Sequence, residues 1–99
     1  MAFFLCRLNP PRPSFPADMT DDERALMREH AAYWSGLLDA GRVVAFGPVA
    51  DPAGAWDVSV IDVDDESAVA AMIAADPVRL RGDGFTYDVF AMPGAIARS

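Results

Sequence analysis

Two ionisable side chains lie at positions where the hydropathy pattern is otherwise apolar. His30, the only histidine, falls on the apolar stripe of a helix predicted over residues 20–40. Asp76 closes the apolar stripe of a second helix predicted over residues 64–76, directly before Pro77. Histidine titrates near neutral pH and can serve as a general base or a general acid, so His30 is the first candidate for chemistry.

The two residues are more informative together than apart. If both helices cover the same face of a sheet, both side chains point toward one core. A buried imidazole and a buried carboxylate each cost free energy when they lack a partner. A hydrogen bond between His30 and Asp76 would satisfy both groups, and the carboxylate would fix the tautomer of the ring, as in hydrolytic triads. Two alternatives stay open, namely a core histidine bonded elsewhere and an aspartate that only caps or turns the chain.

The sequence contains no other grouping that is typical of a reactive site. Cys6 is the only cysteine, so no disulfide can form within the chain, and we expect a buried thiol in a strand. No cluster has the spacing of metal ligands, and we expect neither a metal nor an organic cofactor. Gly47 and the Gly-Asp-Gly segment 82–84 lack the pattern and context of a phosphate loop.

The elements that must position these residues follow a simple order. Thr20 and Glu23 form a capping box that begins the first helix, and Gly41 is a suitable residue to end it. Apolar and alternating runs predict strands over residues 2–8, 43–46, 56–63 and 85–90, the second ended by Gly47-Pro48. The resulting β-α-β-β-α-β order predicts an α+β, ferredoxin-like fold with four antiparallel strands and both helices on one face.

Both faces of this predicted sheet carry apolar residues. The run 56–63 places Trp56, Val58 and Val60 on one side and Ile61 and Val63 on the other. Because the helices cover one face only, the second apolar face predicts a partner. The simplest partner is a second copy of the chain, packed sheet on sheet in a symmetric homodimer.

A proline-rich segment separates the first strand from the first helix. Residues 9–19 contain four prolines, which make an extended and stiff loop. Long loops are often functional, although decoration of the surface is the alternative reading. Phe15 lies between prolines and would be costly to leave exposed, so we expect the loop to fold over another part of the protein.

The composition limits the classes of function. The 99 residues suit a single domain, 1–99, with a tail at 93–99. The net charge is −7 and lysine is absent, which argues against binding nucleic acid or an anionic membrane surface. The chain has no stretch long enough to span a membrane, and its start lacks the pattern of a signal peptide. We therefore expect a cytoplasmic protein.

The order of several short motifs resembles the YciI-like (YCII-related) family. The motifs, which cover roughly residues 2–92, are His30-Ala31-Ala32-Tyr33, Leu37-x-x-x-Gly41, Phe46-Gly47-Pro48 and Asp76-Pro77. The resemblance implies a ferredoxin-like fold assembled as a dimeric α/β barrel. It also implies an active site built on a histidine and an aspartate, which fall on His30 and Asp76. We further expect Tyr33, Gly47 and Pro48, which lie within these motifs, to bind the substrate.

The family resemblance leaves two classes of function open. One related enzyme type removes chloride from a chlorinated hydroxyquinol-type aromatic, which implies a cofactor-independent lyase or hydrolase acting on a small organic molecule. Fold analogy adds a cofactor-free oxygenase or isomerase. The alternative is a non-catalytic dimeric binding or accessory module, in which the pair of His30 and Asp76 is structural. The proline-rich loop 9–19 looks longer than in the shortest family members and would reshape the mouth of a pocket.

Overall fold

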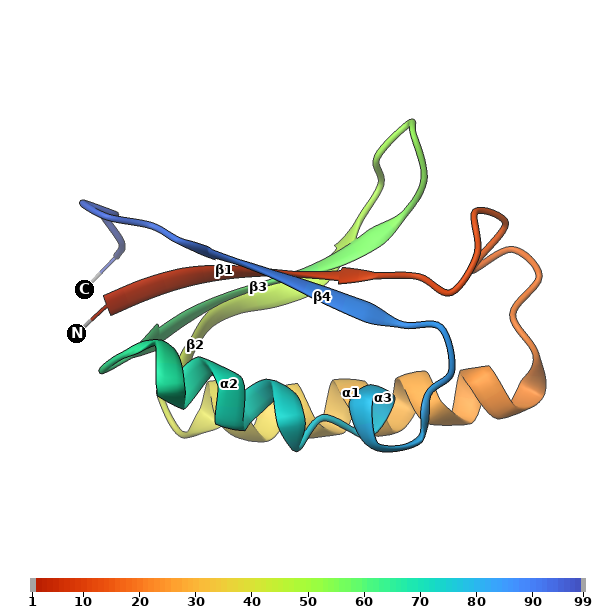
Figure 1. The fold of residues 1–99 in the computed structure, drawn as a ribbon, viewed down its shortest axis with the longest axis horizontal. Coiled ribbons are helices and arrows are strands. Elements are labelled where there is room, and N and C mark those ends of the chain that lie inside the picture. The colour runs from red at the N-terminus through yellow and green to blue at the C-terminus, as the bar shows by residue number, and fades with distance from the viewer. Residues whose placement is uncertain (1, 99) are drawn as a thin grey trace.

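The computed structural model describes residues 2–98 as one four-stranded sheet with helices against one face (Figure 1). All neighbouring strands are antiparallel, in the order β2-β3-β1-β4. This confirms the predicted α+β, ferredoxin-like arrangement. The elements are β1 (Ala2–Asn9), α1 (Asp21–Asp39), β2 (Val43–Val49), β3 (Trp56–Val63), α2 (Glu66–Ala74), α3 (Pro77–Arg81) and β4 (Thr86–Ala91).

Two elements differ from the sequence-based prediction. β2 continues through Gly47 and Pro48, which were expected to end it, and reaches Val49. The strand lies at the edge of the sheet, where a proline that cannot donate a hydrogen bond is tolerated. The second predicted helix stops at Ala74, and Pro77 begins the short α3. Proline suits the first position of a helix, because the N–H that it lacks would have no partner there.

The start of α1 is fixed by the predicted capping box. The Glu23 N–H donates to Thr20 Oγ1 at 3.1 Å, and the Thr20 N–H donates to Glu23 Oε1 at 2.9 Å. Arg12, from the proline-rich loop, donates through both terminal nitrogens to the same carboxylate at 2.8 and 2.7 Å. Its Nε donates to Asp18 at 2.9 Å. The loop is thereby fastened to the first turn of the helix.

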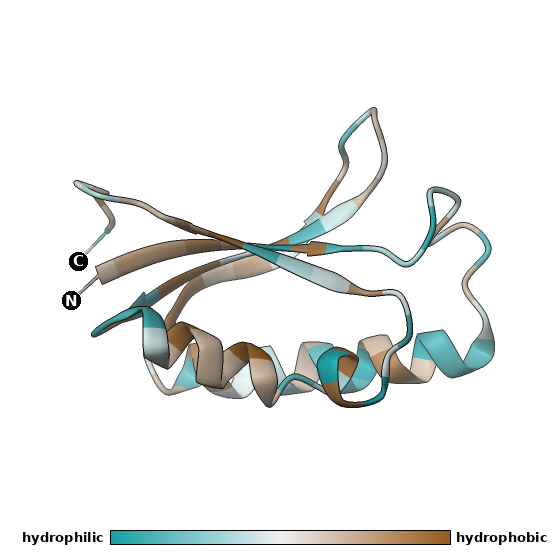
Figure 2. Ribbon diagram, viewed as in Figure 1, coloured by the Kyte–Doolittle hydropathy of each residue, from teal (hydrophilic) through white to brown (hydrophobic). Residues whose placement is uncertain are grey.

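The core lies between the sheet and the helices. Figure 2 shows apolar residues along the strands and on the helices, and polar ones in the loops and the first turn of α1. The buried side chains of the central strands are Phe4, Cys6 and Leu8 of β1 and Ser59, Ile61 and Val63 of β3. Cys6 is fully buried, and burial raises the pKa of its thiol to about 11, as expected for a structural cysteine.

The opposite face of the sheet is not covered by any element within residues 2–98 (Figure 1). Cross-strand pairing brings Leu5, Val60 and Phe90 side by side on this face. Phe90 is 53% exposed. No helix in the described part of the chain is both long enough and apolar enough to cross a membrane.

Candidate active site

Asp76 lies in the bend between α2 and α3 and not on a helix stripe. Its backbone is extended, with φ −67° and ψ 131°, as expected for a residue before proline. Its Oδ1 accepts a hydrogen bond from the Val78 N–H at 3.0 Å and so caps α3. The residue has no exposed surface, so its carboxylate depends entirely on partners within the protein.

Three side chains supply those partners. His30 Nδ1 lies 2.9 Å from Asp76 Oδ2. Trp34 Nε1 and the Tyr87 hydroxyl donate to the same oxygen at 2.7 and 2.5 Å. Burial acts to raise the pKa of Asp76, but the hydrogen bonds from these side chains outweigh it and hold the pKa below its ordinary value. Asp76 is therefore a buried carboxylate anion at neutral pH.

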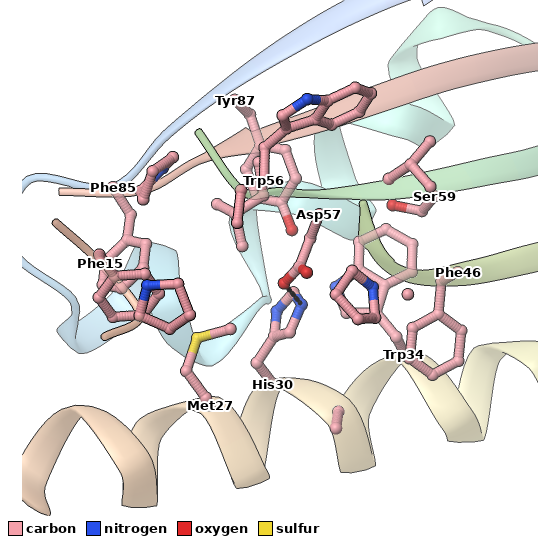
Figure 3. A pocket seen from close by; sticks show the side chains of 18 of the residues that line it. Phe15, Met27, His30, Trp34, Phe46, Trp56, Asp57, Ser59, Phe85 and Tyr87 are labelled. Atoms are coloured by element: carbon pink, nitrogen blue, oxygen red, sulfur yellow. Dashed lines mark ion pairs between the residues drawn. The ribbon is translucent and has the colours of Figure 1, made fainter. Parts of the chain in front are cut away.

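The charge of Asp76 determines the tautomer of His30. An ionised carboxylate can only accept hydrogen bonds, so Nδ1 of the neutral ring carries the hydrogen. Nε2 then holds the free lone pair. His30 is buried, and its Nε2 lies 3.7 Å from Asp57 Oδ2 (Figure 3). Both residues line a cavity. The only histidine is thus oriented with its basic nitrogen toward the cavity.

The cavity in front of His30 has a volume of about 310 Å³. Its polar side chains are His30, Asp57 and Ser59. Aromatic and aliphatic side chains make up most of the wall, among them Leu8, Phe15, Met19, Met27, Trp34, Phe46, Trp56, Phe85 and Tyr87. A concave apolar wall with a few converging polar groups is typical of a site for a small organic molecule.

The proline-rich loop forms part of the wall. Pro10, Phe15, Pro16 and Met19 all line the cavity. Phe15 is 8% exposed and packs edge-on against Phe85, with ring centroids 5.6 Å apart. The expectation that this loop folds over another part of the protein is confirmed.

Comparison with known proteins identifies the family. The family model of the YCII-related domain matches residues 3–93. The chain belongs to the YCII-related family. Among solved structures it resembles 5-chloro-2-hydroxyhydroquinone dehydrochlorinase (TftG) from Burkholderia phenoliruptrix AC1100, in complex with 2,5-dihydroxybenzoquinone, with a TM-score of 0.54 and 14% identity over 90% of each chain. At that identity the likeness shows a common fold. No curated protein matches the sequence.

The substrate-binding residues expected for this YCII-related protein are not all at the cavity. Gly47 and Pro48 line it. Tyr33 is not among the lining residues in the described part of the chain, because its hydroxyl donates to the Met72 carbonyl at 2.5 Å and joins α1 to α2. Trp34, one position later, takes the place at the cavity wall. Tyr33 is therefore a helix-packing residue.

Three residues of the site were not predicted from the sequence, namely Trp34, Asp57 and Tyr87. Trp34 and Tyr87 hold Asp76, whereas Asp57 faces His30 from β3. A signal for Asp57 does exist in the alternation of β3, because it shares its side with the buried Ile61 and Val63. No group of three or more His, Cys, Asp or Glu side chains within residues 2–98 is arranged to hold a metal ion.

Proposed function

We propose that this YCII-related protein is a small enzyme of lyase or hydrolase type in which His30 takes a proton from a small, largely apolar organic molecule. One observation carries the proposal: the only histidine donates from Nδ1 to a buried carboxylate and turns Nε2 toward a cavity. The same arrangement of a carboxylate and an imidazole underlies general-base catalysis in hydrolytic triads.

The charges of the site suit this role. When Nε2 takes a proton, the ring becomes an imidazolium, and its positive charge lies beside the Asp76 anion 2.9 Å from Nδ1. Asp76 keeps its negative charge because its hydrogen bonds hold its pKa below the ordinary value. Both groups are shielded from bulk water, which strengthens their attraction. A positioned base of this kind contributes about 10²–10⁴-fold to a rate.

The cavity indicates the kind of substrate. Its aromatic wall and its volume of about 310 Å³ suit a single ring or a molecule of similar size. The dehydrochlorinase of the same fold was solved with 2,5-dihydroxybenzoquinone, which supports a ring-sized organic ligand and an elimination reaction.

The test uses a substitution that keeps the fold and removes the base. In His30→Asn the amide nitrogen can still donate to Asp76, as Nδ1 does, but nothing replaces Nε2. A thermal-shift screen of small phenols, quinones and enolisable ketones would first find ligands, and NMR would follow their conversion. We expect His30→Asn to fold normally, to bind, and to lose turnover by about 10²–10⁴-fold, while Glu29→Gln on the exposed side of α1 behaves as wild type.

The opposite result has a clear meaning. Turnover that survives His30→Asn unchanged would contradict the proposed role of His30. Ligands that bind to both proteins without conversion would instead favour a binding module, in which the hydrogen bond between His30 and Asp76 only stabilises the fold.

We also propose that the protein acts as a homodimer through the open face of the sheet. The apolar side chains of Leu5, Val60 and Phe90 gather there. An exposed apolar face of this kind is typical of an interface. A second copy with the same face is its simplest partner.

A further inference from the structure

Asp57 is a second ionisable group in the cavity, on the opposite side of the imidazole from Asp76. It lies in β3, paired with Leu8 of β1 and Pro48 of β2, on the face of the sheet that the helices cover. Its side chain is 22% exposed, and its Oδ2 lies 3.7 Å from His30 Nε2. Figure 3 shows the carboxyl group directed at the imidazole ring.

The surroundings of Asp57 differ from those of Asp76. Four donors form hydrogen bonds to the Asp76 side chain, whereas none from residues 2–98 forms one to that of Asp57. The 3.7 Å separation from Nε2 is too long for a hydrogen bond. A carboxylate and a lone pair that face each other repel unless a proton or a ligand donor lies between them. The pair of Asp57 and His30 Nε2 therefore lacks a hydrogen-bond donor, which a proton on Asp57 or a bound ligand would supply.

We propose that Asp57 contacts the substrate beside His30, and that the two side chains form a proton-transfer pair in which one takes a proton from the substrate and the other returns one. The inference rests on the proposed function, because it needs His30 as the base. It assigns Asp57 as a second catalytic residue of the same cavity.

The proton balance of such a cycle closes within the pair. At the start His30 is neutral and Asp57 is protonated. Nε2 takes a proton from one substrate atom, and the Asp57 hydroxyl gives its proton to a second atom or to a leaving group. The pair is then an imidazolium and a carboxylate. Once the product has left, a water molecule between the two groups relays the proton from Nε2 to the Asp57 carboxylate, because the 3.7 Å separation is too long for direct transfer, and the starting state is restored.

This cycle defines a class of substrate and of reaction. The substrate carries an acidic C–H or O–H within reach of Nε2 and a second basic atom within reach of Asp57. Hydroxyl- or carbonyl-bearing rings that fit an aromatic wall have both. The reaction is either a proton shift between two atoms, as in an enol–ketone interconversion, or an elimination whose leaving group departs with a proton.

The burial of Asp57 favours its protonated form. Burial raises the pKa of Asp57, the proximity of His30 acts in the opposite direction, and Asp76 raises the pKa further. The nearby titratable groups are His30 on α1, Asp76 before α3 and Tyr87 on β4, while β1 and β2 bring only apolar side chains beside it. The proton is thus retained to a higher pH than on an exposed aspartate, as a general acid requires.

The first experiment uses the fact that the chain has a single histidine. Its imidazole ¹⁵N signals are followed by NMR from about pH 4 to about pH 8 in wild type, Asp57→Asn and Asp64→Asn. Asp64 is exposed and follows β3, so it controls for the loss of a carboxylate. We expect a step in the wild-type and Asp64→Asn signals where Asp57 ionises, and no such step in Asp57→Asn. Identical curves for all three proteins would overturn the pairing.

The second experiment tests contact with a ligand. The probes are p-nitrophenol and p-nitrotoluene, which have similar shapes but differ in the hydroxyl group. We expect wild type to prefer p-nitrophenol by about tenfold or more, as a hydrogen bond from the protonated Asp57 to the charged phenolate oxygen allows. Asp57→Ala should lose most of this preference, and Asp64→Ala should keep it. A preference that Asp57→Ala retains would overturn the inference, and comparing the two probes cancels any effect of the enlarged cavity.

The His30→Asn protein separates the two proposals. The absorbance of p-nitrophenol distinguishes the phenol from the phenolate. Loss of the bound phenolate signal in His30→Asn, together with a normal preference in Asp57→Ala, would support His30 as the base and reject Asp57. A phenolate signal that survives in His30→Asn would reject the proposed base itself. If Asp57→Ala does not fold, Asp57→Asn, which keeps the shape of the side chain, decides through the titration experiment.

Discussion

Replacing Asp76 by alanine should lower the free energy of unfolding far more than replacing any exposed aspartate does. Without the carboxylate, four buried or partly buried donors lose their acceptor, namely His30 Nδ1, Trp34 Nε1, the Tyr87 hydroxyl and the Val78 N–H. Each buried donor left without a partner costs about 1–3 kcal/mol, and costs within one network do not simply add. Breaking a buried charged pair costs about 3–5 kcal/mol in total, so we expect the free energy of unfolding to fall by that amount.

Urea unfolding followed by circular dichroism measures this difference. For a domain of this size, 1 kcal/mol corresponds to about 4–8 °C, so the melting temperature should fall by roughly 12–40 °C. The matched control is Asp65→Ala, because Asp65 also caps a helix, α2, but is exposed. Loss of an exposed cap costs about 1 kcal/mol. If Asp76→Ala is no more destabilising than Asp65→Ala, the buried network does not stabilise the fold as we argue.

The same carboxylate predicts how stability depends on pH. Because the folded-state pKa of Asp76 lies below that of the unfolded chain, its contribution is complete above about pH 4, the ordinary aspartate pKa. The contribution is lost as the pH falls through the lower, folded-state value. Asp76→Asn should therefore lose less stability on acidification than wild type does. Parallel acid-side curves for the two proteins would refute the sign of this argument.

Three further predictions concern the loop, the open face and Tyr33. Phe15→Ala should cost about 1.5–3 kcal/mol and speed hydrogen exchange in the proline-rich loop, because the buried ring anchors that loop. Phe90→Lys should convert a homodimer into a monomer in light scattering, whereas Ile96→Lys, at a 99% exposed position, should not; a dimer that survives Phe90→Lys would place the interface elsewhere. Tyr33→Phe should lower the free energy of unfolding by about 1 kcal/mol without changing the affinity for p-nitrophenol. Weaker binding would show that Tyr33 contributes to the ligand site.

The sequence predicts the helix and strand boundaries that are set by residues close by in the chain. The start of α1 follows from the capping box of Thr20 and Glu23, and its end follows from Gly41, whose φ of 79° suits glycine. The predicted end of β2 was wrong, because β2 is an edge strand and an edge strand can contain a proline such as Pro48. The order of strands in a sheet is a long-range property that the sequence near Pro48 does not contain.

The site was predictable only in part, for a similar reason. The sequence indicated that His30 and Asp76 point inward, yet Asp76 reaches the core from a bend between helices rather than from a helix stripe. The apolar stripe of α1 includes both Tyr33 and Trp34, and the packing of α1 against α2 decides which of them reaches the cavity. The alternation of β3 indicated that Asp57 shares a side of the strand with Ile61 and Val63. Which side of β3 faces the helices depends on the neighbouring strands, and the sequence of β3 alone does not contain that information.

The carboxylate of Glu23 joins two segments that otherwise have separate tasks. It closes the capping box at the origin of the helix that carries His30, and it binds Arg12 of the loop that walls the cavity. The hydrogen bonds from Arg12 and from the Thr20 N–H lower the pKa of Glu23 to about 2, so the connection persists at any physiological pH. Access to the cavity could therefore be retuned during evolution by changes at Arg12 or Glu23, leaving every group within the cavity intact.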